Sequence, residues 1–309
     1  MNHPKTIECC QNTDTIELVR WLSRKILLDF EYCKNIFEKL RPSSYNKFSL
    51  RLIPREIRND IRVVFSFARY IDDLVDEVSS YLKDDAQNSL TVLQKEWEAS
   101  KGNQFANNPI INSMRNIATK HEIPEEYFTL FFSAMNDDIK YQPIQTFSEL
   151  ENYMYRGSSS LAMIVSHILG YQKREQMAVA KQIGLAMHLT NLLKDIKDDY
   201  QQMNRVYIPN DLLQKFGIKP HSISDVQNSD QWKSLIQTLI KQARQYYQNI
   251  EENLNCLPSR GRKVAKLTLR IYQIFLTKIE ENNYDVFSNK IDIPFSIKVK
   301  IFISTLLES

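Results

Sequence analysis

The segment 70–77 (YIDDLVDE) concentrates four acidic residues in a stretch that otherwise has the spacing of a buried helix. At about 100° per residue, the apolar side chains of this region form one stripe that is typical of a core-facing surface: Val64, Phe67, Ala68, Ile71, Leu74, Val75 and Val78. Phe65, Arg69, Asp72 and Asp76 lie on the flank of that stripe, because residues three or four apart share a helix face. The pattern therefore predicts two carboxylates, one turn apart, beside the core.

The segment 184–200 (GLAMHLTNLLKDIKDDY) repeats this arrangement in a different sequence. Its core stripe consists of Leu185, Leu189, Leu192, Leu193 and Ile196. His188, Asn191, Asp195 and Asp199 follow one another at intervals of three or four residues, so they share a neighbouring face. A second row of oxygen ligands beside a core is therefore expected here.

Two such helices facing each other would place several carboxylates in one partly dehydrated space, where like charges repel and a divalent cation relieves the repulsion. Oxygen ligands, with no cysteine and one nearby histidine, favour a hard ion such as Mg²⁺. Mg²⁺ commonly takes one or two carboxylates and completes its coordination with water and substrate phosphates. Arg69 precedes the first segment, and Lys194 and Arg205 bracket the second. These residues predict a magnesium-dependent site for a phosphate or diphosphate.

A purely structural explanation competes with this one, because acids four residues apart are common on solvated helix faces. We assign Asp84, Asp85, Asp137 and Asp138 to such faces. The pairing of D-x-x-x-D with N-x-x-x-D-x-x-x-D, each beside an apolar stripe and accompanied by bases, favours a functional site for the other two segments.

The elements that must position these residues are predicted to be helices. The 309-residue chain is 43% hydrophobic, has only 6 glycines and contains no Asn-Gly or Asp-Gly hairpin dipeptide. No fixed repeat or linker stands out, so a single all-α domain spanning 1–309 is expected. Helical periodicity predicts helices over residues 15–40, 55–79, 84–100, 110–120, 125–140, 146–170, 175–200, 230–257 and 262–281, with breaks at 102–109 and 201–230.

Composition excludes several other classes of protein. Lys and Arg number 40 against 37 Asp and Glu, a balance too even for a general nucleic-acid binder. The four cysteines have no zinc-finger spacing and are interpreted as reduced thiols, as in a cytoplasmic protein. Neither a signal peptide nor a membrane-spanning run is predicted, and the apolar segment 296–307 (SIKVKIFISTLL) is short and interrupted by lysines.

Several segments resemble those of the squalene/phytoene synthases, a family that joins two prenyl diphosphates head to head. The segment 67–77 (FARYIDDLVDE) resembles the first aspartate-rich motif of the family, and 191–209 (NLLKDIKDDYQQMNRVYIP) resembles the second. Weaker similarity is found at 43–54 (SSYNKFSLRLIP), 151–171 (ENYMYRGSSSLAMIVSHILGY) and 270–279 (RIYQIFLTKI), so the resemblance covers about residues 40–285.

The resemblance implies an all-α isoprenoid-synthase bundle around a central cavity, with three Mg²⁺ ions bridging carboxylates to diphosphate. The implied metal-facing residues are Asp72, Asp76, Asp195 and Asp199, assisted by Asn191. The implied diphosphate contacts are Arg69, Lys194, Arg205 and Tyr207, and the residues expected near substrate are Ser44, Tyr45, Tyr155 and Tyr272.

The sequence departs from the family pattern at three places. His188 stands where the family often has Gln, and it could bind diphosphate, act as an acid or base, or be a satisfied buried histidine. Lys194 stands where Arg is usual, which keeps the charge but loses the bidentate fork. Ser158–Ser160 replace a stretch that usually contains glycine. These departures bear on substrate length and product, not on the metal chemistry.

The resemblance implies that an allylic C–O bond ionises and that a second prenyl diphosphate attacks, giving a cyclopropylcarbinyl diphosphate and then squalene, dehydrosqualene or phytoene. Substrate length (C15 or C20), a requirement for NADPH and the oligomeric state stay open. Peripheral membrane contact is consistent with a water-insoluble product. Two alternatives are a terpene cyclase or chain-elongating prenyltransferase, which the R-V-Y-I-P extension at 205–209 disfavours, and a non-catalytic relative that acts in assembly.

Overall fold

The computed structural model describes residues 29–35, 51–76, 83–102, 105–227, 229–288 and 291–308, and every regular element in these ranges is helical. The predicted all-α class is therefore confirmed. The α-helices are α3 (Arg55–Asp76), α4 (Lys83–Ala99), α5 (Pro109–Lys120), α6 (Glu125–Ile139), α7 (Phe147–Met154), α8 (Ser160–Ile168), α9 (Arg174–Met203), α10 (Asn210–Lys215), α11 (Asp230–Asn253), α12 (Ser259–Glu281) and α13 (Phe295–Leu307). Shorter helical turns are η1 (Ser100–Gly102), η2 (Tyr155–Ser159), η3 (Pro220–Ser222) and η4 (Leu254–Cys256).

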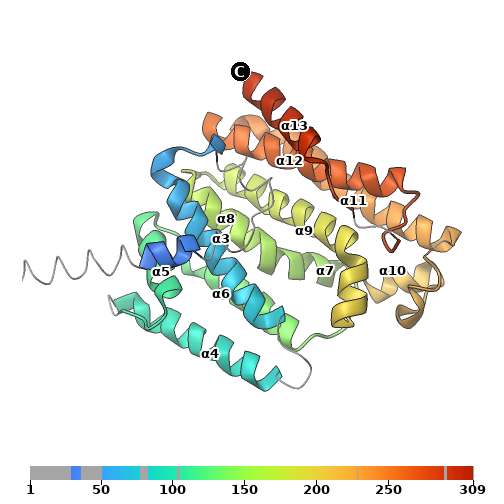
Figure 1. The fold of residues 1–309 in the computed structure, drawn as a ribbon, viewed down its shortest axis with the longest axis horizontal. Coiled ribbons are helices and arrows are strands. Elements are labelled where there is room, and N and C mark those ends of the chain that lie inside the picture. Colours follow the sequence, from blue (N-terminus) through green and yellow to red (C-terminus); the bar gives the residue numbers. More distant parts are fainter. Residues whose placement is uncertain are drawn as a thin grey trace, which may run out of the picture.

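Helix α9, the longest of these, runs through the middle of the molecule (Figure 1). It packs against α8 and η2 on one side and against α11 and α12 on another, while α3 packs on α8, α6 and α5. One large apolar cluster is built around α3 to α6 and α8, and a second around α9, α11 and α12. The two acidic segments therefore lie on helices that belong to opposite halves of the core.

The predicted helices correspond to observed ones to within a few residues, with three differences. The stretch 146–170 is interrupted, because the π-helical turn η2 separates α7 from α8. The segment 201–230 contains the short α10 and the turn η3, which were not predicted. Residues 295–307, considered in the sequence only as a membrane segment, form α13 on the surface of α12. Of the predicted helix at 15–40, only residues 29–35 are described, and they are helical.

A close backbone contact joins α9 to η2. A Cβ atom added to Gly184 would lie 2.3 Å from Cα and 2.6 Å from the backbone N of Ser159. Real Cβ atoms do not approach other atoms so closely, so only glycine permits this packing. Ser159 is fully buried, and its hydroxyl donates to the carbonyl of Lys181, 2.8 Å away, on the same helix α9. Helix α9 and the π-helical turn are thereby held in direct backbone contact.

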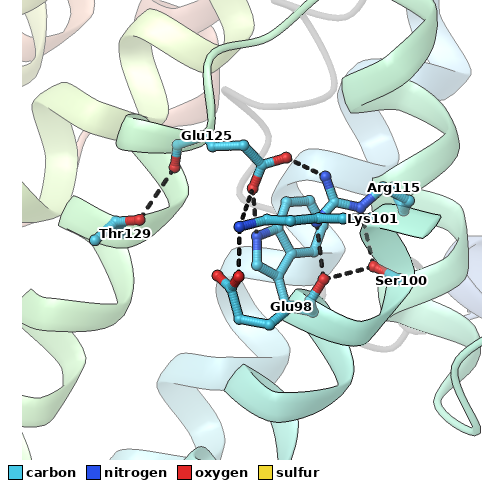
Figure 2. A network of polar contacts seen from close by, with 7 residues as sticks. Glu98, Ser100, Lys101, Arg115, Glu125 and Thr129 are labelled. Carbon is cyan, nitrogen blue, oxygen red and sulfur yellow. Dashed lines mark hydrogen bonds and ion pairs between the residues drawn. The ribbon is translucent and has the colours of Figure 1, made fainter.

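The helices at the edge of the molecule are tied together by a polar network around the buried Trp97 (Figure 2). The Arg115 guanidinium lies 3.5 Å from the centre of the Trp97 ring and donates to the Trp97 carbonyl at 2.9 Å. The indole Nε1 donates to Glu125 at 3.1 Å, and Glu125 also pairs with Arg115. This cation–π and ion-pair arrangement joins α4, α5 and α6, so that α6 is fixed as one wall of the interior.

We expect Gly184→Ala to destabilise the protein by about 3 kcal/mol, because the added methyl overlaps backbone atoms that cannot move aside as a side chain would. The measurement is the midpoint of urea unfolding followed by circular dichroism. Gly102→Ala is the matched control, since a Cβ there meets nothing within 4 Å. It should change the unfolding free energy by no more than about 0.5 kcal/mol. Equal midpoints for the two variants would show that the contact has little energetic weight.

Candidate active site

A cavity of about 650 Å³ lies between α3, α6, η2, α8 and α9, and the segment that follows α9 closes one side of it. The predicted face of α3 opens onto this cavity with Phe65, Arg69 and Asp72. The predicted face of α9 does the same with His188, Asn191, Lys194, Asp195 and Asp199. Two acidic helices that are more than 100 residues apart in sequence therefore face one space, as their spacing predicted.

The helical stripes explain why these side chains point inward together. Val64, Phe67, Ile71 and Val75 of α3 are at most 4% exposed. On α9, Leu185, Leu189, Leu193 and Ile196 are likewise buried. Burial of these stripes fixes the rotation of each helix about its axis. The acidic residues on the flank then have to border the cavity instead of open solvent.

Basic side chains already neutralise part of the acidic wall. Arg69 lies 3.4 Å from Asp72 and 2.5 Å from Asp73, and Lys194 pairs with the adjacent Asp195. Asp76 is the last residue of α3, one turn after Asp72, and its side chain lies outside the described part of the structure. Among the described residues, no group of three or more acidic, histidine or cysteine side chains is arranged to hold a metal ion by itself.

The end of α9 brings two further predicted residues to the cavity. Asn204 has φ of 51°, a left-handed conformation that Asn tolerates better than most residues, and it ends the helix. The chain then turns back, so Arg205 and Tyr207 line the cavity. The hydroxyl of Tyr141 donates to the carbonyl of Val206 and accepts from its N–H, both at 2.8 Å. This pair of bonds holds the turned segment in place.

Asp138 of α6 is a cavity residue that the sequence analysis assigned wrongly to a solvated face. It is 8% exposed, and its Oδ1 accepts hydrogen bonds from Tyr153 at 2.7 Å and Tyr207 at 3.1 Å. Arg205 donates to the Asp138 carbonyl at 3.1 Å. By contrast, the neighbouring Asp137 is exposed and pairs with Arg156, 2.5 Å away. Adjacent positions on a helix point about 100° apart, so two identical side chains have different surroundings.

The two tyrosines form one wall of the cavity. Their rings stack with centres 5.4 Å apart, and burial followed by the nearby Asp138 carboxylate raises the pKa of Tyr153 and Tyr207 well above the usual value. Both hydroxyls therefore stay protonated and can donate. Tyr153 was not among the predicted site residues. No local sequence pattern marks Tyr153 as a cavity residue, because the direction of its side chain depends on where the π-helical turn η2 begins.

His188 borders the cavity beside the Tyr153 ring, with ring centres 5.2 Å apart. Burial lowers its pKa to about 4, opposed by the Met154 backbone, so the ring is neutral at physiological pH. The Nδ1 atom is buried and makes no well-formed hydrogen bond within the described residues. His188 is thus a buried, neutral ring at the edge of the cavity, and its role stays a prediction.

The serine run divides into structural and cavity-facing residues. The hydroxyl of Ser160 donates to the carbonyls of Arg156 and Gly157 at 2.6 and 2.7 Å, and Ser159 bonds to Lys181. Ser158 alone of the three borders the cavity. A second, apolar cavity of about 210 Å³ adjoins the first and shares five lining residues with it: Phe65, Ala68, Ser158, Leu161 and Asn191.

Two residues expected near substrate are not brought to either cavity. Tyr155 packs between the two apolar clusters, with Lys181 Nζ 4.6 Å from its ring centre. Residues two positions apart on a helix point about 200° apart, so its side chain faces away from that of Tyr153. Tyr272 packs on α12 against Phe275. Ser44 and Tyr45 lie outside the described residues.

None of the helices described in the structure is long and apolar enough to cross a membrane.

Comparison with known proteins identifies the family of this chain. The family model for squalene/phytoene synthase matches residues 41–297. The 15-cis-phytoene synthase of Synechocystis is 25% identical over 280 residues, which cover 86% of this chain and 80% of the relative.

Two solved structures have a similar fold. A dehydrosqualene synthase aligns with a TM-score of 0.81 at 24% identity, over 92% of this chain and 97% of the other. A squalene synthase from Alicyclobacillus acidocaldarius aligns with a TM-score of 0.76 at 21% identity, over 84% and 96% of the two chains. With the family model matching most of its length, this chain belongs to the squalene/phytoene synthase family, whose members are prenyltransferases.

Proposed function

We propose that this protein condenses two prenyl diphosphates head to head in a Mg²⁺-dependent reaction, through a cyclopropylcarbinyl diphosphate. The observation that carries the proposal is the convergence of the α3 and α9 acids on one cavity that adjoins an apolar chamber. A prenyl diphosphate has the same two parts, a charged head and a hydrocarbon tail. The two cavities match these parts in order and in chemistry.

The donor set suits Mg²⁺. Asp72 and Asp76 on one helix, and Asn191, Asp195 and Asp199 on the other, offer only oxygen ligands. They would hold Mg²⁺, which commonly takes one or two protein carboxylates and completes its coordination with water and substrate phosphates. Bound Mg²⁺ would neutralise charge on the departing diphosphate.

The basic groups would bind the rest of the leaving diphosphate. Arg69, Lys194 and Arg205 border the cavity, and the Tyr207 hydroxyl, which donates to Asp138, accepts from Arg205 at 3.2 Å and helps to hold it in place. Donors fixed in place before the reaction stabilise charge as it develops on the leaving oxygen, so the allylic C–O bond can break. The electron pair leaves with the diphosphate, and an allylic cation stays on the hydrocarbon.

Asp138 would act as a positioning residue in this scheme. Its carboxylate holds the hydroxyls of Tyr153 and Tyr207 in one orientation through Oδ1. The aromatic faces of these tyrosines, with Phe65 and Phe131, border the space where the cation would form. Aromatic faces are electron-rich and stabilise cations without reacting as water would.

When the cyclopropylcarbinyl diphosphate ionises in turn, a second cation forms. The product depends on how this cation is neutralised. Hydride from NADPH would give squalene, and loss of a proton would give dehydrosqualene from C15 or phytoene from C20 substrates. Product analysis with and without NADPH distinguishes these outcomes.

The first test is product analysis by mass spectrometry after incubation with farnesyl or geranylgeranyl diphosphate, with and without NADPH. We expect a C30 or C40 hydrocarbon in the presence of Mg²⁺. Removal of divalent ions with EDTA should stop consumption of the substrate, and excess Mg²⁺ should restore it. Substrates recovered intact under every condition would contradict the proposal and favour a non-catalytic member of the family. A cyclised or chain-elongated product would favour the other enzyme classes.

The second test addresses the acids. Asp72→Ala and Asp195→Ala should each lower the turnover number by about 100-fold or more, because each removes a carboxylate that would hold Mg²⁺ at the leaving diphosphate. Both side chains are more than a third exposed, so the free energy of unfolding should change by less than about 1 kcal/mol. Turnover is followed by diphosphate release, and folding by urea denaturation. Unchanged turnover in either folded variant would remove that residue from the proposed site.

The third test compares two adjacent aspartates. Asp138→Ala should lower the turnover number about 100-fold, because the hydroxyls of Tyr153 and Tyr207 lose their common acceptor. Asp138→Asn keeps an acceptor oxygen and should recover part of that loss. Asp137→Ala removes only an exposed ion pair to Arg156 and should retain nearly full turnover. If the Asp137 and Asp138 variants behave alike, the proposed positioning role is wrong.

A further inference from the structure

Tyr171 and Gly261 touch each other in the lining of the apolar cavity of about 210 Å³, and neither is among the residues that it shares with the polar cavity. Tyr171 is 2% exposed, and Gly261 lies in the first turn of α12. A Cβ atom added to Gly261 would lie 2.2 Å from the Tyr171 hydroxyl oxygen and 2.5 Å from its ring. The hydroxyl end of the tyrosine therefore lies directly against the backbone of Gly261, in space that any larger residue at position 261 would take.

The position of Tyr171 is set by the turn that ends α8. Gly170 has φ of 82°, which favours glycine, and the N–H of Tyr171 donates to the carbonyl of Ser166 at 2.9 Å. The ring is thereby directed back under α8 and toward α12. Burial raises its pKa, so the hydroxyl stays neutral and presents no charge to an apolar occupant.

The depth of this cavity can be compared with the length of a prenyl tail. Its lining on α9 runs from Asn191, which it shares with the polar cavity, to Ala180. These positions are separated along the helix by about 16 Å, at about 1.5 Å per residue. An extended chain advances about 1.2 Å per bond, as in an extended polypeptide, so a farnesyl chain of eleven main-chain bonds spans about 13 Å. A geranylgeranyl chain of fifteen bonds spans about 18 Å on the same scale.

We propose that Tyr171 and Gly261 form the floor that limits the length of the prenyl tail, so that this enzyme uses C15 in preference to C20 diphosphate. The inference rests on the proposed function for its substrate class, and adds the choice of chain length. The lining between the polar end and the floor is almost wholly apolar, with residues such as Val165, Ile183 and Met187. Such a wall can bind a tail along its length, but only the floor limits how long the bound tail can be.

The test measures relative kcat/KM for farnesyl and geranylgeranyl diphosphate in competition. The native enzyme should favour the C15 substrate by at least about 10-fold, because a longer tail meets the floor. Tyr171→Ala should shift the ratio toward C20 by about 10-fold or more, since it opens the floor. Tyr171→Phe keeps the ring and should leave the ratio near that of the native enzyme. Gly261→Ala should shift it further toward C15, because the new methyl pushes the ring into the cavity.

Tyr127→Ala is the control for loss of a buried tyrosine. Tyr127 is 9% exposed and borders neither cavity, so its loss should affect unfolding and leave the ratio unchanged. Where Tyr171→Ala does not fold, Tyr171→Leu removes the ring and keeps an apolar filling. A folded Tyr171 variant with the native ratio, or a native preference for C20, would overturn the inference.

A binding measurement separates this inference from the proposed function. Non-reacting thiodiphosphate analogues of both lengths are titrated by calorimetry in the presence of Mg²⁺. A protein that makes no product but binds the C15 analogue about 10-fold more tightly than the C20 analogue would refute the condensation and support the floor. Condensation with equal affinity and equal use of both lengths would support the function and refute the floor. Binding of neither analogue would refute both.

Discussion

The backbone contact between Gly184 and Ser159 is the constraint on which the site depends. It holds the central helix α9 against the π-helical turn η2, and a single methyl group would separate them. The turn presents Gly157 and Ser158 to the cavity, while α9 presents its row from His188 to Asp199. A π-helical turn costs regular hydrogen bonding within the helix, and such turns are frequently found at functional sites. Here the turn lies directly against Gly184 of α9, and the Ser159 hydroxyl bonds to the Lys181 carbonyl of the same helix.

Helix α9 also lines both parts of the interior, the polar cavity and the apolar cavity. Its C-terminal portion, from His188 onward, borders the polar cavity, the portion from Ala180 to Met187 borders the apolar one, and Asn191 borders both. Because one rigid helix spans both, the distance between the charged end and the apolar end is set by helical rise. A ligand with a charged head and a long hydrocarbon tail matches such an interior, whereas a compact polar metabolite would leave the apolar part empty.

In the wall of the polar cavity that α6 forms, one residue orients several other side chains. Asp138 accepts from Tyr153 and Tyr207, and its carbonyl accepts from Arg205. These partners come from α7 and from the segment after α9, so one residue of α6 joins three parts of the chain. Burial strengthens each hydrogen bond and makes a missing one costly, which is why such a group tends toward a single arrangement. The network around Trp97 in turn holds α6 in place from outside the cavity.

The sequence alone determined the helical class, most helix bounds and the two acidic rows, because these depend on local periodicity that each segment carries by itself. The rotation of α3 and α9 could be predicted from their apolar stripes, and Asp72 and Asp195 accordingly face the cavity. Tertiary structure decided the rest. Asp137 and Asp138 are identical in the sequence, and only the packing of α6 makes one exposed and the other a cavity residue. Tyr153 and Tyr155 are separated by the start of η2, and Tyr171 meets Gly261 across 90 residues of chain. Such contacts depend on how separate helices pack, which no local pattern encodes.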